Sequence, residues 1–286
     1  MVKKIDQGIQ FLTNNMQLFQ CPVCHAAFVE VKGTSLCCEQ NHHFDVSKKG
    51  TVFFLAHQAK NEYDKEMLSS RFKIAQDGLF NPILDVIFDL MGPNYQGTTI
   101  DVGCGEGSQL DYLTGKGLKG AKIGFDISKD AIQLASSHFT SAFWCVADLA
   151  KSPFASNQYD TLLNIFSPSN YQEFKRILKE HGTVIKVVPE KNYLIELRHL
   201  FYQDQKEKQT YQNDLVIEKF QEHFPEMEQH RCTYEFPLNE EQFQALMKMT
   251  PLGWGASEEA TKSALLNPLK KITVDVCILV GKKQIS

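Results

Sequence analysis

Apolar and polar positions alternate with two different periods in the middle of the chain. Between residues 98 and 189, short apolar runs of strand type alternate with segments whose apolar residues recur at helical spacing. Repeated strand–helix alternation predicts a parallel sheet with helices on both faces, an α/β fold. We expect strands within 98–102, 121–128, 142–149, 159–168 and 183–189, and helices within 108–117, 129–139 and 171–182.

The flanking segments follow other patterns and predict a chain of several parts. Short β-type runs (AAFVEV, TVFFL) lie among Cys and His residues up to residue 57, and a polar helical connector follows. Further strands are expected at 232–238 and 272–281, with an inserted segment, 238–270, between them. The predicted parts are a small module at 1–57, the connector at 58–78 and the main domain at 79–286.

Composition narrows the class of protein. The chain has 286 residues, 43% of them hydrophobic, and a formal net charge of −4, which argues against a protein that coats nucleic acid through overall charge. No apolar run reaches 18 residues and the first 20 residues lack a signal-peptide pattern, so we expect a cytoplasmic protein with no membrane span. Four of the eight cysteines cluster between residues 21 and 38, which favours a metal site over disulfides.

The cysteine cluster has the spacing of a zinc site. Cys21 and Cys24 form a CxxC knuckle, whose turn can direct two thiolates at one metal ion. Cys38 and His42 form a CxxxH pair that completes a Cys₃His set, with Cys37 and His43 as adjacent competitors for the same positions. Four protein ligands leave no open coordination position, so the expected Zn²⁺ is structural. The alternative interpretations are free buried cysteines or a redox CxxC.

A glycine-rich loop after the first strand of the main domain predicts a cofactor site. Asp101 leads the loop, and Gly103, Gly105 and Gly107 allow a tight turn and close approach of a ligand. Asp126 ends the next strand, where a carboxylate can accept hydrogen bonds from both ribose hydroxyls. Asp148 ends the strand after that, where it could meet an adenine amine.

The charge of the loop distinguishes two classes of cofactor. Acids at Asp101 and Glu106 would repel the pyrophosphate of a dinucleotide, and no phosphate-binding Gly-x-x-x-x-Gly-Lys motif is present. The same acids suit the sulfonium and amino groups of S-adenosylmethionine. The loop therefore predicts S-adenosylmethionine binding in preference to NAD, and a Rossmann-like class I methyltransferase domain. A glycine-rich turn without a cofactor is the remaining alternative.

A further strand end should face the methyl acceptor. Asn164, Ser167 and Pro168 lie in the sequence NIFSPS, which lacks the Asp/Asn-Pro-Pro-Tyr/Phe pattern of exocyclic-amine methyltransferases. It also lacks a cysteine for covalent attack on a pyrimidine. A ring nitrogen as acceptor agrees with both absences, although Ser167-Pro168 could equally serve only to turn the chain. No residue stands out as a general base.

Taken together, these motifs resemble the bacterial 23S ribosomal RNA guanine-N1 methyltransferases, which join a zinc-binding module to a Rossmann-like methyltransferase domain. The specific part of the resemblance is the CxxC…CxxxHxFD block, in which Phe44-Asp45 follows the ligands and the spacing indicates Cys38 and His42. The resemblance covers nearly the whole chain. It also includes shorter matches: Ser47–Gly50, Gly78 with Pro82, Ser167-Pro168, Pro189 with Glu196-Leu197, and Met249–Pro251 with Trp254.

The resemblance implies further site residues and a function. Phe80, Gln109, Leu110 and Tyr193 would line the S-adenosylmethionine site, with Phe80 and Tyr193 replacing a tyrosine and a histidine of the family pattern. The alternative for Phe80 and Tyr193 is that they are aromatic residues of the core. Trp254 would stack on RNA or anchor its loop by packing. The implied activity is methylation of guanine N1 in a 23S rRNA hairpin loop. A homodimer is a separate hypothesis, because one zinc module offers little RNA-binding area. The alternatives are a small-molecule methyltransferase with a structural zinc module, and a non-enzymatic zinc-ribbon RNA-binding protein.

Overall fold

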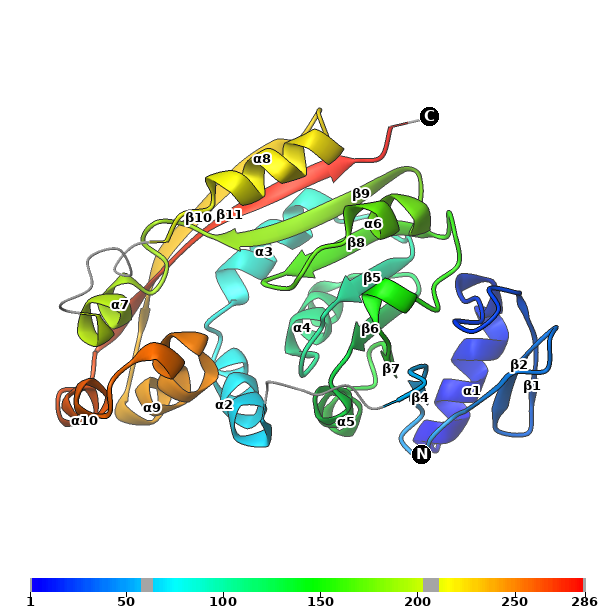
Figure 1. Ribbon diagram of the computed structural model, residues 1–286, viewed down its shortest axis with the longest axis horizontal. Helices are drawn as coiled ribbons and strands as arrows, with labels where there is room; N and C mark the ends of the chain where they lie inside the picture. Colours follow the sequence, from blue (N-terminus) through cyan, green and yellow to red (C-terminus); the bar gives the residue numbers. More distant parts are fainter. Residues whose placement is uncertain (1, 58–63, 203–210, 285–286) are drawn as a thin grey trace.

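A large mixed sheet flanked by helices forms the body of the protein, and a small three-stranded sheet lies near its N-terminal end (Figure 1). The computed structural model describes residues 2–57, 64–202 and 211–284. The strands are β1 Phe28–Lys32, β2 Ser35–Cys38, β3 His43–Asp45, β4 Val52–Phe53, β5 Thr99–Val102, β6 Lys122–Asp126, β7 Phe143–Val146, β8 Tyr159–Ile165, β9 Leu178–Pro189, β10 Glu228–Pro237 and β11 Lys271–Lys282. The α-helices are α1 Lys4–Asn14, α2 Lys65–Gln76, α3 Asn81–Met91, α4 Ser108–Lys116, α5 Lys129–His138, α6 Tyr171–Ile177, α7 Ile195–Phe201, α8 Asp214–His223, α9 Glu240–Met249 and α10 Glu258–Leu266.

The large sheet has the strand order β10-β11-β9-β8-β5-β6-β7-β4. Neighbouring strands from β9 to β4 run parallel, whereas β11 and β10 pair antiparallel to their neighbours at one edge. The parallel core confirms the α/β architecture expected from the strand–helix alternation. Because the parallel strands share one direction, their carboxyl ends lie along the same edge, where an open α/β sheet binds its ligand.

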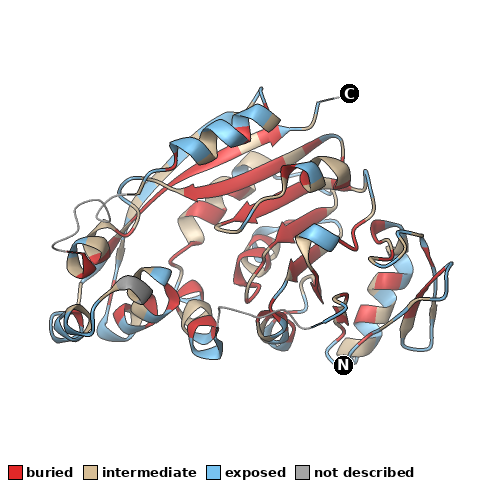
Figure 2. Cartoon of the chain, in the orientation of Figure 1, coloured by how far each residue is buried: buried red, intermediate tan, exposed pale blue. Residues whose placement is uncertain are grey.

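Both faces of the large sheet are buried, as the apolar strand sequences require. On β8, Leu162 packs into the core that also contains residues of α1, α6 and α8, while the next residue, Leu163, packs on the opposite side with residues of α3, α4 and α5. Successive side chains of a strand point to opposite faces, so one apolar run supplies both cores. Figure 2 shows the resulting buried sheet between helices whose outer sides are exposed.

The small N-terminal part is continuous with the main sheet. Residues Val52–Phe53 of the TVFFL run, which the sequence placed with the zinc segment, form strand β4 and pair parallel with β7. Helix α1 and strands β1 and β2 contribute to the same hydrophobic core as β5–β8. The cysteine-rich segment is therefore anchored to the large sheet by shared packing.

The helix expected over 171–182 is shorter than predicted. Helix α6 ends at Ile177, and Leu178 already begins β9. Leu178 is fully buried and pairs with Tyr159 at the start of β8. Strand pairing at this position therefore overrides the helical spacing of the sequence, and the helix prediction for 178–182 is wrong.

The C-terminal strands β10 and β11 pair antiparallel, and α9 and α10 lie in the segment between them. Residues 58–63 of the predicted connector lie outside the described residues; its remainder forms α2, which packs against α9. Within the described ranges, no helix is both long and apolar enough to cross a membrane.

Candidate functional site

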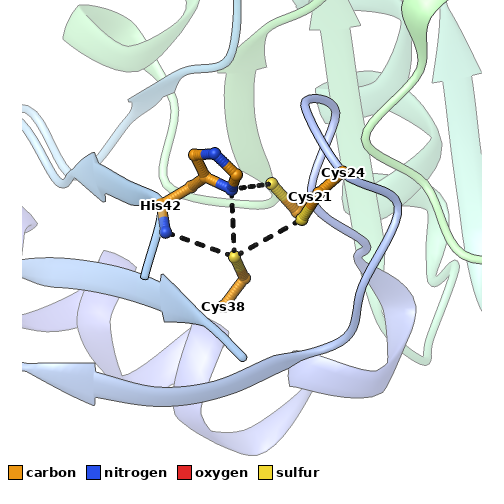
Figure 3. A group of neighbouring side chains, drawn as sticks. All are labelled: Cys21, Cys24, Cys38 and His42. Atoms are coloured by element: carbon orange, nitrogen blue, oxygen red, sulfur yellow. Dashed lines mark hydrogen bonds between the residues drawn. The ribbon is translucent and has the colours of Figure 1, made fainter. Parts of the chain in front are cut away.

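Four side chains of the N-terminal part converge on one point. The ligand atoms of Cys21, Cys24, Cys38 and His42 all lie within 4.8 Å of one another (Figure 3). Cys24 Sγ lies 3.7 Å from Cys38 Sγ, and His42 Nδ1 lies 3.6 Å from Cys21 Sγ and 3.5 Å from Cys38 Sγ. Ligand atoms around a tetrahedral zinc, with Zn–S of about 2.3 Å and Zn–N of about 2.0 Å, are separated by roughly 3.5 to 3.8 Å. The group therefore fits a Zn²⁺ ion.

Cys37 and His43, the adjacent competitors for the metal site, point away from the four-residue group. They interact with each other, with 3.2 Å between Sγ and Nδ1, and do not belong to that group.

The pKa of Cys38, which burial alone would raise, is lowered to about 7 by hydrogen bonds from the backbone of His42 and Gln40. These hydrogen bonds stabilise the thiolate form of Cys38, which is the form that binds metal, whereas burial raises the pKa of Cys21 to about 11.

The second site is a cavity of about 280 Å³ at the carboxyl ends of the parallel strands. Residues from the ends of β5, β6, β7 and β8 line it, and Met67, Leu68 and Arg71 of α2 border it. Of the residues predicted from the sequence, it brings together Gly103, Gly105, Asp126, Asp148, Ser167 and Pro168. The cavity therefore lies where the topology predicts ligand binding.

The glycine loop forms one wall of this cavity and depends on the absence of side chains. Gly103, Gly105 and Gly107 all have positive φ angles, a conformation that other residues rarely adopt. A Cβ at position 103 would lie 2.7 Å from the Cβ of Ser167, so the β8 turn packs directly on the loop. A Cβ on Gly107 would lie 2.9 Å from Trp144.

Two buried acids lie behind the loop, outside the cavity lining, and Arg71 borders the cavity next to one of them. Asp101 and Glu106 are each about 1% exposed, and each carries a buried carboxylate oxygen without a hydrogen-bond partner among the described residues. Burial, together with the Glu106 carboxylate, raises the pKa of Asp101 to about 7, although Arg71 opposes the shift. Arg71 Nε lies 3.8 Å from Glu106, and the guanidinium lies over the Phe80 ring at 5.3 Å. A ligand that carries both an ammonium and a carboxylate group matches this arrangement.

The strand-end acids Asp126 and Asp148 have different environments. Asp126 accepts hydrogen bonds from the backbone N–H groups of Gly105 and Ser128, at 3.0 and 2.8 Å. Burial raises the pKa of Asp126, and these hydrogen bonds oppose the shift. Asp148 accepts a hydrogen bond from the backbone of Ala150 and lines the cavity. The apolar side chains of Ile127 and Leu149, which follow the two acids, also line it.

Other predicted site residues lie behind this cavity or apart from it. Phe80 and Gln109 border a separate hollow beside α4, and Leu110 is fully buried in the core. Tyr193 packs on Phe166, with ring centroids 5.4 Å apart, and Phe166 packs in turn on Phe80. Phe166 itself lines the cavity.

Two more residues, Asn164 and Trp254, were predicted from the sequence to lie near a methyl acceptor. Asn164 is fully buried beneath the turn that carries Ser167 and Pro168. The side chain of Trp254 lies outside the part of the chain that the structure describes.

Arg71 was not singled out in the sequence. It lies within a polar connector with several lysines and acids, and no motif distinguishes it. Only the fold of α2 against the cavity reveals that it is the arginine of the site.

The fold and the two sites define a class of protein, a zinc-ribbon S-adenosylmethionine-dependent methyltransferase. The sequence model of the zinc-ribbon family described as "RlmA, N-terminal" matches residues 19–62, and that of the family described as "Methyltransferase domain" matches residues 100–187. A solved Haemonchus contortus phosphoethanolamine N-methyltransferase 2, in complex with S-adenosylmethionine, has the same fold. It is 16% identical with a TM-score of 0.50, and the match covers 79% of this chain and 59% of that one.

Full-length relatives define the family more narrowly. A Bacillus subtilis protein named "Putative 23S rRNA (guanine-N(1)-)-methyltransferase YxjB" is 41% identical over 95% of this chain and 99% of its own. The 23S rRNA (guanine(748)-N(1))-methyltransferase of Streptomyces fradiae is 26% identical over 93% of this chain and 97% of its own. The chain belongs to the family of 23S rRNA (guanine-N1)-methyltransferases.

Proposed function

We propose that the protein transfers a methyl group from S-adenosylmethionine to N1 of a guanine in a hairpin loop of 23S rRNA. The observation that carries the proposal is that a Cys₃His group and a cofactor cavity share one hydrophobic core. The chain also aligns over nearly its whole length with a relative named as a 23S rRNA guanine-N1 methyltransferase. A loop base suits the substrate, because an unpaired base is cheaper to extract than one stacked in a duplex.

Three residues that line the cavity, together with Asp101 behind the glycine loop, would have complementary roles toward the cofactor. The Asp101 carboxylate would pair with the amino group of the methionine moiety, and Arg71 with its carboxylate. Asp126 would accept hydrogen bonds from the ribose hydroxyls, and Asp148 from the adenine amine. These assignments rest on the orphaned oxygen of Asp101, on the charge of Arg71 and on the positions of the acids at the ends of β6 and β7.

S-adenosylmethionine supplies an electrophilic methyl group, and the protein's contribution is to align the acceptor with it. The turn Ser167-Pro168 borders the cavity and would hold the guanine edge there. The Ser167 hydroxyl donates a hydrogen bond to the Val102 carbonyl, which ties the turn to the glycine loop. We therefore assign Ser167 to the shape of the site and not to removal of the N1 proton.

Cys21, Cys24, Cys38 and His42 would hold a structural Zn²⁺, and the module they stabilise would add RNA-contacting surface. Trp254 would stack on RNA. A substrate that is part of the ribosome supports a cytoplasmic location. A homodimer stays a prediction of the sequence, and sedimentation equilibrium of the zinc-loaded protein tests it directly.

Transfer of tritiated methyl groups tests the substrate class. We expect incorporation into protein-free 23S rRNA transcripts or ribosomal particles, and none into 16S rRNA transcripts of similar length. If calorimetry detects S-adenosylmethionine binding but neither RNA nor particles accept methyl groups, the protein is a small-molecule methyltransferase and the proposal is wrong.

A further inference from the structure

A lysine is buried beneath the turn that borders the cofactor cavity. Lys186 of β9 is 5% exposed and lies beside Asn164 of β8 in the parallel pairing of the two strands. Its ammonium group donates hydrogen bonds to Asn164 Oδ1 at 2.7 Å and to Ser169 Oγ at 2.8 Å. Throughout the described ranges, no carboxylate lies within 4.0 Å of this ammonium group, so a buried charge is held by neutral oxygens alone.

This contact fixes the orientation of the Asn164 amide. A lysine ammonium has three donors and no acceptor, so it must face the amide oxygen. The Ser169 hydroxyl also donates to the same oxygen, at 2.8 Å. The amide NH₂ of Asn164 is therefore directed away from Lys186, toward the turn.

The NH₂ group of Asn164 then holds the turn from below. It donates to Ser167 Oγ at 2.6 Å, to the Pro168 carbonyl at 3.0 Å and to the Ser167 carbonyl at 3.2 Å. Phe166, just before the turn, has a φ of 55°, which is unfavourable for a residue other than glycine. A strained turn keeps its shape only when the surrounding contacts determine it. Here the contacts come from the Asn164 amide, which Lys186 orients.

We propose that Lys186 is a positioning residue for methyl transfer, which holds the Ser167-Pro168 turn in its reactive arrangement through the side-chain amide of Asn164. The inference rests on the proposed function, because this turn is the part of the cavity wall assigned to the methyl acceptor. Lys186 and Asn164 would act on the turn and would not contact the acceptor themselves.

Charge is what makes lysine suited to the position. A hydrogen bond from a charged donor is stronger than one between neutral groups, so an ammonium orients the amide more firmly than a hydroxyl or amide would. Burial lowers the pKa of Lys186 to about 8, so the group is still largely protonated at neutral pH. Keeping a charge buried without a carboxylate partner costs stability, which is the expected trade-off at a functional position.

The substitution Lys186→Met keeps the length of the side chain and removes its donors. We expect kcat for RNA methylation to fall about 100-fold, a loss that misplacing a reacting group by about an ångström can cause. The Kd for S-adenosylmethionine should stay within about twofold, because Asp101, Arg71 and Asp126 are untouched. A kcat within twofold of wild type would overturn the proposal.

Lys122→Met is the matched control. Lys122 is the first residue of β6, at the opposite end of the strands from the cofactor cavity. It donates to the carbonyls of Leu118 and Gly120, and burial lowers its pKa too. This variant should leave kcat unchanged even if it lowers the melting temperature as much as Lys186→Met does. An equal loss of kcat in both variants would show a general effect of stability and overturn the inference.

A double-mutant cycle tests whether Lys186 acts through Asn164. Asn164→Leu should lower kcat, and the double variant Lys186→Met/Asn164→Leu should lower it no further, since both changes break one chain of contacts. Losses that multiply in the double variant would contradict the proposal.

Hydrogen exchange separates this inference from the proposed function. The backbone amides of residues 164–167, 169 and 170 should exchange faster in Lys186→Met than in wild type, and not in Lys122→Met. Hydrogen exchange is measured without substrate. If the wild-type protein fails to methylate RNA, the proposed function is refuted, but the exchange data still show whether Lys186 holds the Ser167-Pro168 turn. Unchanged exchange in Lys186→Met would overturn the role.

Discussion

Phe11 of α1 and Phe143 of β7 stack face to face, with ring centroids 5.0 Å apart and ring planes within 3° of parallel. The contact joins the N-terminal helix to the methyltransferase sheet. Beside it, the Tyr159 hydroxyl of β8 donates a 2.7 Å hydrogen bond to the Leu18 carbonyl, and Phe19 packs on Phe143 and Phe154. The zinc-binding part is thus packed against the catalytic domain as a component of its core.

Removal of zinc should therefore destabilise the whole protein and not only its first 50 residues. Chelation of the ion should lower the melting temperature of the methyltransferase domain, measured by the near-ultraviolet circular dichroism of the tryptophans, Trp144 and Trp254, which both belong to that domain. Metal binding to a site absent from the unfolded chain adds its free energy to folding. A main unfolding transition unchanged by chelation would contradict this coupling.

The adjacent cysteines provide a matched test of the ligand set. Cys38→Ser should release the zinc, whereas Cys37→Ser should retain one ion per chain, because Cys37 faces His43 outside the four-residue group. Atomic absorption of the purified variants measures the difference. Loss of zinc from Cys37→Ser with retention in Cys38→Ser would reverse the assignment.

Gly103→Ala should weaken S-adenosylmethionine binding at least tenfold. Its added Cβ would lie 2.7 Å from that of Ser167, at a φ of 70° that alanine disfavours, so the loop must shift. Gly115→Ala is the control in the following helix: its Cβ would meet no atom within 4 Å, and the protein should gain about 0.5–1 kcal/mol of stability. Calorimetry gives the affinities and urea unfolding the stabilities. An unaffected Gly103→Ala would exclude the loop from the site.

Cofactor binding should depend on pH through Asp101. Because its pKa is raised to about 7, the carboxyl is protonated below that pH and must lose the proton to pair with an ammonium group. Affinity for S-adenosylmethionine should thus be about tenfold lower at pH 6 than at pH 8, with proton release on binding at pH 6. Titrations in buffers of different ionisation enthalpy detect the released proton.

The Asp101→Asn variant should bind weakly with no such pH dependence, while Asp111→Asn, on the first turn of α4, should behave like wild type. A wild-type affinity that is flat between pH 6 and 8 would argue against the role of Asp101.

Arg71→Met should reduce the affinity for S-adenosylmethionine by about 10- to 100-fold, as expected for loss of a hydrogen bond between charged groups. Lys73→Met on the same helix is the control, because Lys73 pairs with the exposed Glu241 away from the cavity. Equal affinities of the two variants would remove Arg71 from the proposed site.

Much of this molecule follows from local sequence rules. The alternation of strand and helix patterns predicted the parallel sheet. The CxxC and CxxxH spacings predicted the four metal-ligand residues that the structure brings together. Asp126 ends one strand and the glycine loop follows another, so their place at the carboxyl ends of the strands could be inferred.

Local sequence patterns could not predict contacts between segments that lie far apart in the chain. Arg71 reaches the cavity because α2 folds back across it, and Lys186 pairs with Asn164 because β9 lies beside β8; neither depends on a motif. The early end of α6 has the same cause, since Leu178 pairs with a strand that starts 19 residues earlier in the chain, at Tyr159.

The central claim concerns the atom that is methylated, and mass spectrometry of the product tests it most directly. 23S rRNA transcripts would be incubated with the zinc-loaded protein and S-adenosylmethionine, then digested to nucleosides and compared with authentic standards. We predict 1-methylguanosine in the wild-type reaction and none with Asp101→Ala. Methyl groups on another atom of guanine or on another base, with no 1-methylguanosine, would contradict the account.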